Sequence, residues 1–193
     1  MSWTVLLTPN EVAALAGTSR TIVEKALEQK ILGASRGARA DRRLLPLHAV
    51  ALAATAKILG RRLSVNDKKR VAREIASMSP AGLKMAEIEI APSVLVRIGS
   101  LTREAVGRAE RYAAARDAHI EIAEGVQGGR PVIKGTRLTV SAIYGRLSSG
   151  DTVDTLVEDY PEIPREAFEA AFLYGKTHPR IGRPTSRRAA KTV

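Results

Sequence analysis

The sequence predicts an α+β protein that is mainly helical. Most segments place apolar residues three or four positions apart, which is the period of an amphipathic helix. Only a few short stretches alternate with the period of two that strands show. Aromatic residues are 4% of the 193 residues, so a core has to be built from Ala, Val, Leu and Ile. Such small side chains suit closely packed helices with small β layers.

The positive charge is concentrated at the two ends of the chain. The net charge of +11 divides into +8 over residues 1–75, +1 over 76–117, −3 over 118–178 and +5 over 179–193. A surface that only keeps a protein soluble more often has interspersed charges. The two basic ends therefore predict two separate surfaces for anionic partners, with simple solubility and an inert tail as the alternative.

The composition also excludes several classes of protein. The chain has no cysteine, which rules out disulfides and thiolate metal sites. Its longest apolar run, residues 49–56, is far too short to span a bilayer. The first residues lack a basic region before a long apolar stretch, so they do not read as a secretory signal. We expect a cytoplasmic protein with no membrane partner.

Two short helices joined by a tight turn are expected near the start of the chain. Thr8, Pro9 and Glu11 form a helix start with a capping box, and Gly17 ends that helix. Thr18 or Ser19 then caps a second helix, whose inward face carries Ile22, Val23, Ala26 and Leu27.

Ala13, Gly17 and Val23 have the spacing of a helix-turn-helix. The small Ala13 lets the two helices cross closely, Gly17 forms the turn, and the apolar Val23 packs the second helix against the first. The start of the second helix would then enter a DNA major groove. The predicted DNA-binding side chains on this helix are Ser19, Arg20, Thr21 and Lys25. An αα-hairpin with a solvated basic face is the structural alternative.

An arginine-rich hairpin is expected next. Ile31–Leu32 and Leu44–Leu45 flank a turn that contains Gly37, and a helix over residues 47–59 follows. Its arginines would contact phosphates or the minor groove, and they are Arg36, Arg39, Arg42 and Arg43. The order of helix, turn, helix, hairpin and helix resembles the winged helix-turn-helix of the MerR-like class. This resemblance implies DNA binding.

The middle of the chain mixes helices and strands. Helices are expected over 65–77, with Ser64 as cap, and over 101–119, with Thr102 as cap. Residues 84–98 alternate and predict two strands, in which Glu87 and Glu89 share one face. Solvent-facing alternation explains these carboxylates better than a metal site. A further strand after residue 119 would join this pair in one sheet, or the sheets of two chains would join in a dimer.

The stretch GRPVIKGTRLTV, residues 129–140, is not a phosphate loop, because its Lys-Gly-Thr order is wrong and no helix follows directly. We expect a strand over 131–133, a turn at Gly135 and a helix capped by Thr139. Two more helices complete a small domain in which Arg137 would pair with Asp151, Asp154 and Glu158. Its expected core is Val140, Ile143, Leu147, Val153, Leu156, Val157, Ile163, Phe168, Ala171, Phe172 and Tyr174.

The run GVQGGRPVIKGTRLTVSAIYGRL and the following SSGDTVDTLVEDYPEIPREAFEAAFLYGKTHP resemble a small domain of unknown function shared by many bacterial VapB-type antitoxins. The resemblance covers about residues 119–178. It implies an antitoxin that regulates its own operon, and a toxin partner of the PIN-like, metal-dependent ribonuclease type. The family domain is itself helix-turn-helix-like. Residues 118–178, however, carry a net charge of −3, and negative charge repels DNA phosphates, so we assign this domain to dimerisation.

The basic tail offers planar guanidinium groups that suit carboxylates. Under the antitoxin interpretation it would enter the acidic cleft of the toxin, through Arg180, Arg183, Arg187 and Arg188. The last helix is an alternative place for toxin contact.

The predicted units are a winged helix-turn-helix domain (1–78), a β/α connector (79–117), a strand-plus-three-helix domain (118–178) and a flexible basic tail (179–193). Operator DNA, the toxin and a second copy of the chain are the expected partners. We expect no enzyme activity, cofactor, metal or small-molecule substrate, because His48, His119 and His178 lack catalytic or ligand spacing. A transcription regulator without a toxin is the alternative function.

Overall fold

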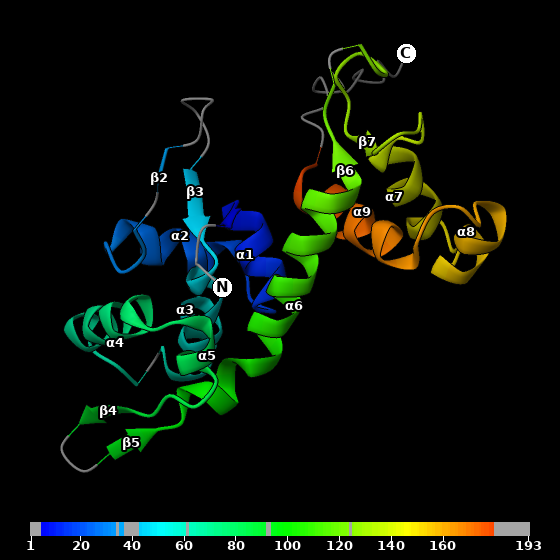
Figure 1. Ribbon diagram of the computed structural model, residues 1–193. Helices are drawn as coiled ribbons and strands as arrows, with labels where there is room; N and C mark the ends of the chain where they lie inside the picture. The colour runs from blue at the N-terminus through cyan, green and yellow to red at the C-terminus, as the bar shows by residue number, and fades with distance from the viewer. Residues whose placement is uncertain are drawn as a thin grey trace, which may run out of the picture.

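The computed structural model describes residues 5–33, 35–36, 43–60, 62–91, 94–123 and 125–179. Within these residues the protein is mainly helical and has small antiparallel sheets, which confirms the predicted α+β class. Figure 1 shows two bodies, and the long helix α6 (Ile98–His119) runs from the first to the second. No helix in the described ranges is both long and apolar enough to cross a membrane.

The first body packs short helices around α3 and carries a three-stranded sheet, ordered β1-β3-β2 with antiparallel neighbours. Its core is aliphatic, as the composition requires, and includes Leu7, Val12, Val23, Leu45 and Ile75. Its elements are β1 (Leu6–Leu7), α1 (Pro9–Leu15), α2 (Arg20–Glu28), β2 (Ser35–Arg36), β3 (Arg43–Pro46), α3 (His48–Leu59), α4 (Val65–Ser77), α5 (Pro80–Leu83), β4 (Ile88–Ala91) and β5 (Val94–Val96).

The start of α1 forms as the sequence predicts. The Thr8 side chain accepts a hydrogen bond from the Glu11 amide, and the Glu11 carboxylate accepts one from the Thr8 amide. Gly17 has a φ of +62°, a left-handed conformation that glycine adopts without strain, and it sets the turn into α2. The predicted helix pair is therefore confirmed.

The arginine-rich hairpin also forms, but its predicted strand ends are wrong in part. Ser35 and Arg36 pair with Leu44 and Arg43, whereas Ile31–Leu32 lies outside the hairpin. Leu32 is only 5% exposed, so its side chain belongs to the core and strand pairing starts after it. Strand β1 was not predicted, because two residues are too few to show alternation.

Helix α6 begins four residues before the predicted cap. Thr102 lies inside the helix, where it is buried and its hydroxyl donates to the Ile98 carbonyl at 2.8 Å. A threonine can form this backward bond in mid-helix, which makes it a poor marker of a helix start.

The strands of the connector also differ from the expectation. The hairpin of β4 and β5 is confirmed, with Ile88 opposite Val96 and Glu89 opposite Leu95. The strand after α6, β6 (Ile120–Glu121), does not join that hairpin. It pairs with β7 (Val132–Ile133) and so belongs to the second body.

The second body holds three helices beside the β6–β7 pair: α7 (Val140–Ser148), α8 (Val153–Asp159) and α9 (Arg165–Thr177). Thr139 caps α7, as predicted, and Thr152 caps α8. Gly135 has a φ of +75° at the turn after β7, where the Thr136 hydroxyl donates to the Ile133 carbonyl.

The core of this body is close to the predicted one. Phe168 and Leu156 are fully buried at its centre. Phe172 is an exception, because it lies at the edge and stacks on Tyr144 with ring centroids 5.6 Å apart. Helix α9 also packs against α6 and α1, and the Asn10 side chain donates to the Thr177 carbonyl at 2.8 Å.

Candidate nucleic-acid interface

Three of the predicted groove-reading residues lie at the exposed start of α2, and the fourth, Lys25, lies in its last turn. Ser19 is the N-cap residue in an extended conformation and makes no side-chain cap hydrogen bond. Ser19, Arg20, Thr21 and Lys25 are all exposed. The opposite side of the helix holds Val23, which is fully buried in the core. The local amphipathic pattern thus fixes which face of α2 meets solvent.

Glu24 connects this helix to the hairpin. Its carboxylate lies 3.1 Å from the Arg20 Nε and 3.8 Å from an Arg43 guanidinium nitrogen. Arg20 and Arg43 keep 64% and 63% of their side chains exposed, so these pairs are weak surface interactions. Two predicted DNA-binding arginines therefore share one carboxylate, and both guanidinium groups remain open to a phosphate.

Several predicted site residues lie outside the described residues. Arg36 has its backbone placed in β2, but its side chain is outside the description. Arg39 and Arg42 lie outside it entirely, as do all four predicted toxin-binding residues, Arg180, Arg183, Arg187 and Arg188.

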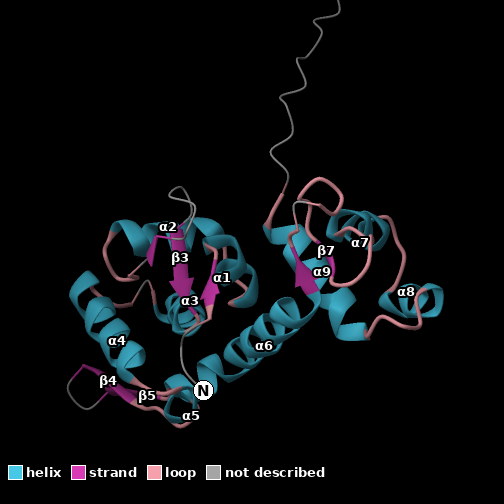
Figure 2. Ribbon diagram, turned by 45° about the horizontal axis from the view of Figure 1, so that its top comes forward, coloured by secondary structure: helices cyan, strands magenta, loops and turns pink. Residues whose placement is uncertain are grey.

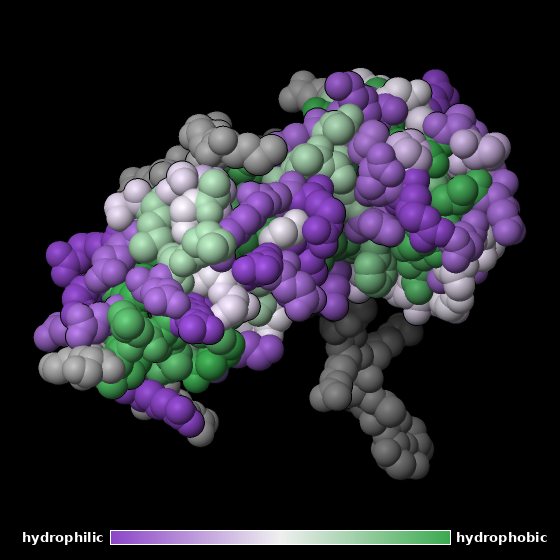
Figure 3. Space-filling view, turned by 60° about the horizontal axis from the view of Figure 1, so that its bottom comes forward, coloured by the Kyte–Doolittle hydropathy of each residue, from purple (hydrophilic) through white to green (hydrophobic). Residues whose placement is uncertain are grey.

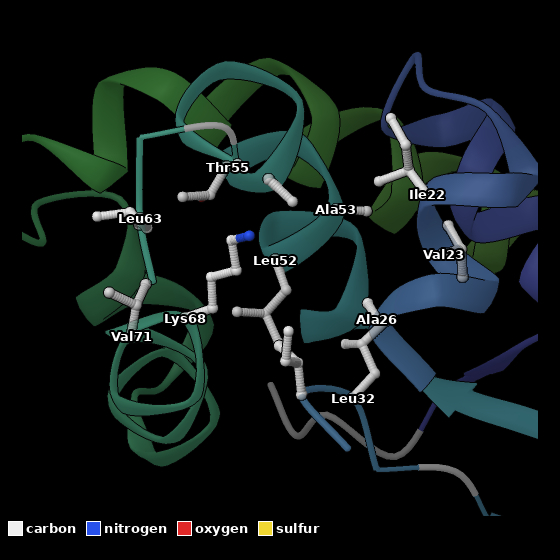
Figure 4. Close-up of a pocket in the computed structure, with 13 residues that line it drawn as sticks. Ile22, Val23, Ala26, Leu32, Leu52, Ala53, Thr55, Leu63, Lys68 and Val71 are labelled. Carbon is white, nitrogen blue, oxygen red and sulfur yellow. The ribbon is translucent and has the colours of Figure 1, made fainter. Parts of the chain in front are cut away.

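A small apolar cavity lies behind α2, between α2, α3 and α4 (Figure 4). Its volume is about 40 Å³, far below the several hundred Å³ of a typical small-molecule pocket. Ile22, Ala26 and Leu52 line it, and Lys68 reaches toward Leu52 from α4. The Thr55 hydroxyl is buried at this place and has no hydrogen-bond partner among the described residues. The cavity is best read as a packing void behind the exposed helix.

A buried ionic cluster fixes α1 to α6. Glu11 is 1% exposed, and its Oε1 accepts hydrogen bonds from the Tyr112 hydroxyl at 2.6 Å and from Arg116 at 3.2 Å. Burial and the adjacent Glu11 carboxylate raise the pKa of Tyr112 above its usual 10.0. The pKa of Arg116 is also raised: burial opposes the shift, but the hydrogen bond to Asp117 and the Glu11 charge outweigh it. The capping residue of α1 is thus also its anchor to α6.

The second body pairs its helical arginines with its own carboxylates. Arg146 donates to Asp151 at 2.5 Å and to Asp159 at 2.6 Å, and these hydrogen bonds raise the pKa of Arg146. Arg165 of α9 pairs with Asp154. These contacts correct the expectation for Arg137, which is exposed on the turn after β7 and pairs with none of these acids.

Apolar surface gathers at the opposite end of the molecule from the β2–β3 hairpin. Figure 3 shows this patch at the end that carries β4 and β5. Three exposed side chains contribute to it: Met85 is 81% exposed, Leu95 63% and Val94 46%. Glu87, which the sequence places beside Glu89, pairs with Arg97 at 3.0 Å.

The histidines lie in separate places. Burial lowers the pKa of His48 below its usual 6.5 at the start of α3. His119 lies 3.9 Å from Glu166, and the ring of His178 stacks on Tyr174 with centroids 4.0 Å apart. Within the described ranges, no group of three His, Cys, Asp or Glu residues is arranged to hold a metal ion.

The comparison with protein families matches part of the second body. Residues 120–175 match a family described as "Protein of unknown function (DUF433)". The chain is also similar to the "Uncharacterized protein y4eO" of Sinorhizobium fredii (strain NBRC 101917 / NGR234), at 31% identity over 81 residues. This alignment covers 42% of the chain and 36% of that protein, so the chain spans about a third of the length of the curated relative it matches. No solved structure matches the chain significantly.

Three contacts near α1 and α2 were not predicted from the sequence. Glu24 follows Arg20 by four residues, a helical spacing that signals the pair. The contact of Glu11 with Tyr112, 101 residues away, has no local signal. Nor does the position of Lys176 beside Gly17, Thr18 and Arg20 along one groove.

Proposed function

We propose that this protein is the antitoxin of a type II toxin–antitoxin system, which binds the operator DNA of its own operon and neutralises a PIN-like ribonuclease. In this proposal the first body acts as a winged helix-turn-helix. Helix α2 enters the major groove, and the β2–β3 hairpin lies along the DNA backbone. The protein has no enzymatic role of its own.

The observation that carries the DNA-binding part is the exposed, cationic start of α2 beside an arginine-bearing hairpin. Arg20 and Arg43 lie on these two elements, and among the described residues they share the carboxylate of Glu24. Lys25 is exposed and makes no ion pair with a described residue. A duplex offers phosphates at the spacing that such side chains need, so binding would release counterions and depend strongly on salt.

The toxin-neutralising part rests on the resemblance of residues 119–178 to VapB-type antitoxin domains and on the basic tail. The match of residues 120–175 to a family of unknown function is compatible with this reading and names no activity. Arg180, Arg183, Arg187 and Arg188 would enter the metal-binding cleft of the ribonuclease and replace the metal charge there.

A homodimer belongs to the proposal, because a two-fold symmetric operator is read by a two-fold symmetric protein. The helical second body is one candidate for the dimer interface. The β4–β5 hairpin is the other, and the exposed Val94 and Leu95 support it.

The test combines one pull-down with two binding assays. The tagged full-length protein is recovered from its native cell, and the partners are identified by mass spectrometry. The purified protein is then titrated with the DNA upstream of its own gene, and a recovered ribonuclease is assayed with and without it.

We expect a co-purifying ribonuclease that loses activity, together with salt-sensitive binding of the upstream DNA. Replacing Arg180, Arg183, Arg187 and Arg188 by Gln should restore ribonuclease activity and leave DNA binding in place. DNA binding without any ribonuclease partner would point to a transcription regulator with no toxin. Absence of DNA binding at low salt would overturn the proposal.

A further inference from the structure

We infer that the second body also contacts DNA, through a groove at the α1–α2 turn in which Lys176 helps to hold a backbone phosphate. This inference rests on the proposed DNA-binding function and extends it to a part of the chain whose charge of −3 argued against such contact.

The groove has a volume of about 530 Å³ and is built from both bodies. Gly17, Thr18 and Arg20 line it from the helix-turn-helix side, and Lys176 and Pro179 line it from the end of α9. The hydrogen bond from Asn10 to the Thr177 carbonyl holds the two sides together. The position of Lys176 relative to α2 is therefore set by the fold and does not depend on a free linker.

The charged side chains that line this groove are both positive among the described residues: Arg20 and Lys176. A third cation, Lys57 of α3, also lies beside this turn. Its Nζ would be 3.6 Å from a Cβ atom placed on Gly17. Lys57 and Lys176 are exposed and form no ion pair with a described carboxylate. Three elements thus bring cations to one turn, an arrangement that an anion would stabilise.

The groove also has an unused hydrogen-bonding group. The Thr18 hydroxyl is buried, and no described residue makes a hydrogen bond with it. Once rotated out of its buried position, this hydroxyl could donate to a phosphate oxygen, and such contacts are common between proteins and the DNA backbone. The chemistry of the groove therefore suits a phosphodiester.

Its position favours DNA over an acidic protein as the source of the anion. Arg20 belongs both to the groove and to the exposed start of α2, so the two surfaces are continuous. The β2–β3 hairpin and the C-terminal end of α9 point toward the same side of the molecule in Figure 1 and in Figure 2. A duplex seated on α2 and the hairpin would pass over this groove.

The test uses full-length variants and the DNA upstream of the protein's own gene, titrated at several salt concentrations. Lys176→Gln removes the proposed contact, and Lys176→Arg keeps its charge. The matched control is Arg103→Gln near the start of α6, which removes an exposed cation that pairs with no described carboxylate. Circular dichroism melts confirm that each variant folds.

Removing one phosphate contact should lower the salt slope of log K by about 0.9 and weaken binding about fivefold at 0.15 M salt. Lys176→Gln should show this loss, whereas Lys176→Arg and Arg103→Gln should bind like the wild type. Equal behaviour of Lys176→Gln and Arg103→Gln would overturn the inference while the proposed function stands. A Lys176→Gln effect on ribonuclease binding alone would also overturn it, by assigning the groove to the toxin. If the wild type itself binds no DNA, the proposed function fails first.

Discussion

The arginines around α2 and those of helices α7 and α9 have opposite surroundings. Arg146 and Arg165 lie among carboxylates of their own body, and each pairs with two of them. Arg20 and Arg43 share the single carboxylate of Glu24. The same residue type therefore closes an internal network in one region and stays open to an external anion in the other.

This difference shows why net charge is a coarse guide to a binding surface. The second body is acidic overall, but several of its carboxylates pair with arginines of the same body. Its remaining cations are exposed and have no carboxylate partner among the described residues: Arg130, Lys134 and Arg137 on the glycine-rich segment (residues 129–140), and Lys176 near the end of α9. Whether a cation already has a partner decides what it can bind, and this is a property of the fold.

The largest expected effect separates buried from exposed ion pairs. Glu11→Leu leaves the Tyr112 hydroxyl and the Arg116 guanidinium without their buried acceptor, so we expect a loss of about 3 kcal/mol in the free energy of unfolding. Asp154→Asn, which breaks the exposed pair with Arg165, should cost less than about 1 kcal/mol. Urea unfolding followed by circular dichroism measures both.

Similar losses in the two variants would contradict this contrast. Such a result would mean that the Glu11 cluster does not hold α1 to α6.

A smaller effect compares two buried threonines, one in each body. The Thr55 hydroxyl has no partner among the described residues, whereas the Thr177 hydroxyl donates to the Leu173 carbonyl at 2.8 Å. Thr55→Val should therefore stabilise the protein by up to about 1 kcal/mol, and Thr177→Val should destabilise it by about 1 kcal/mol. Differential scanning calorimetry would show opposite shifts, and shifts of the same sign would mean that one environment is misassigned.

The smallest effect concerns Glu24, an acid beside the predicted interface. Glu24→Gln frees Arg20 and Arg43 and removes a negative charge near the phosphates, so affinity for the upstream DNA should rise about threefold. Asp154→Asn removes an equal charge from the second body and should leave that affinity unchanged. A fluorescence anisotropy titration distinguishes the two, and a weaker Glu24→Gln complex would show that Glu24 positions the arginines for binding.

Local patterns predicted most helices of the fold. Thr8 with Glu11, Ser64, Thr139 and Thr152 are caps whose hydrogen bonds lie within three residues, so the sequence alone reveals them. Thr102 was predicted as a cap but lies within α6, where its hydroxyl donates backward to the Ile98 carbonyl. The two-residue strands β1 and β6 pair with distant partners, and their pairing has no signal in a short window.

The candidate site was predictable only on its own elements. The exposed face of α2 follows from the burial of Val23, which the helical period indicates. The approach of Lys57 and Lys176 to the α1–α2 turn depends on how α3 and α9 pack against the helix pair. Contacts between residues that lie far apart in the sequence leave no spacing pattern that the sequence alone reveals.

The salt dependence of DNA binding distinguishes α2 from the glycine-rich segment as the DNA contact. Two double variants each remove two exposed cations: Arg20→Gln with Lys25→Gln on α2, and Arg130→Gln with Arg137→Gln on the glycine-rich segment. We expect the first variant to lower the salt slope for the upstream DNA by about 2 and the second to keep the wild-type slope. A wild-type slope in the first variant and a reduced one in the second would contradict the proposal, because DNA would then bind the glycine-rich segment instead of α2.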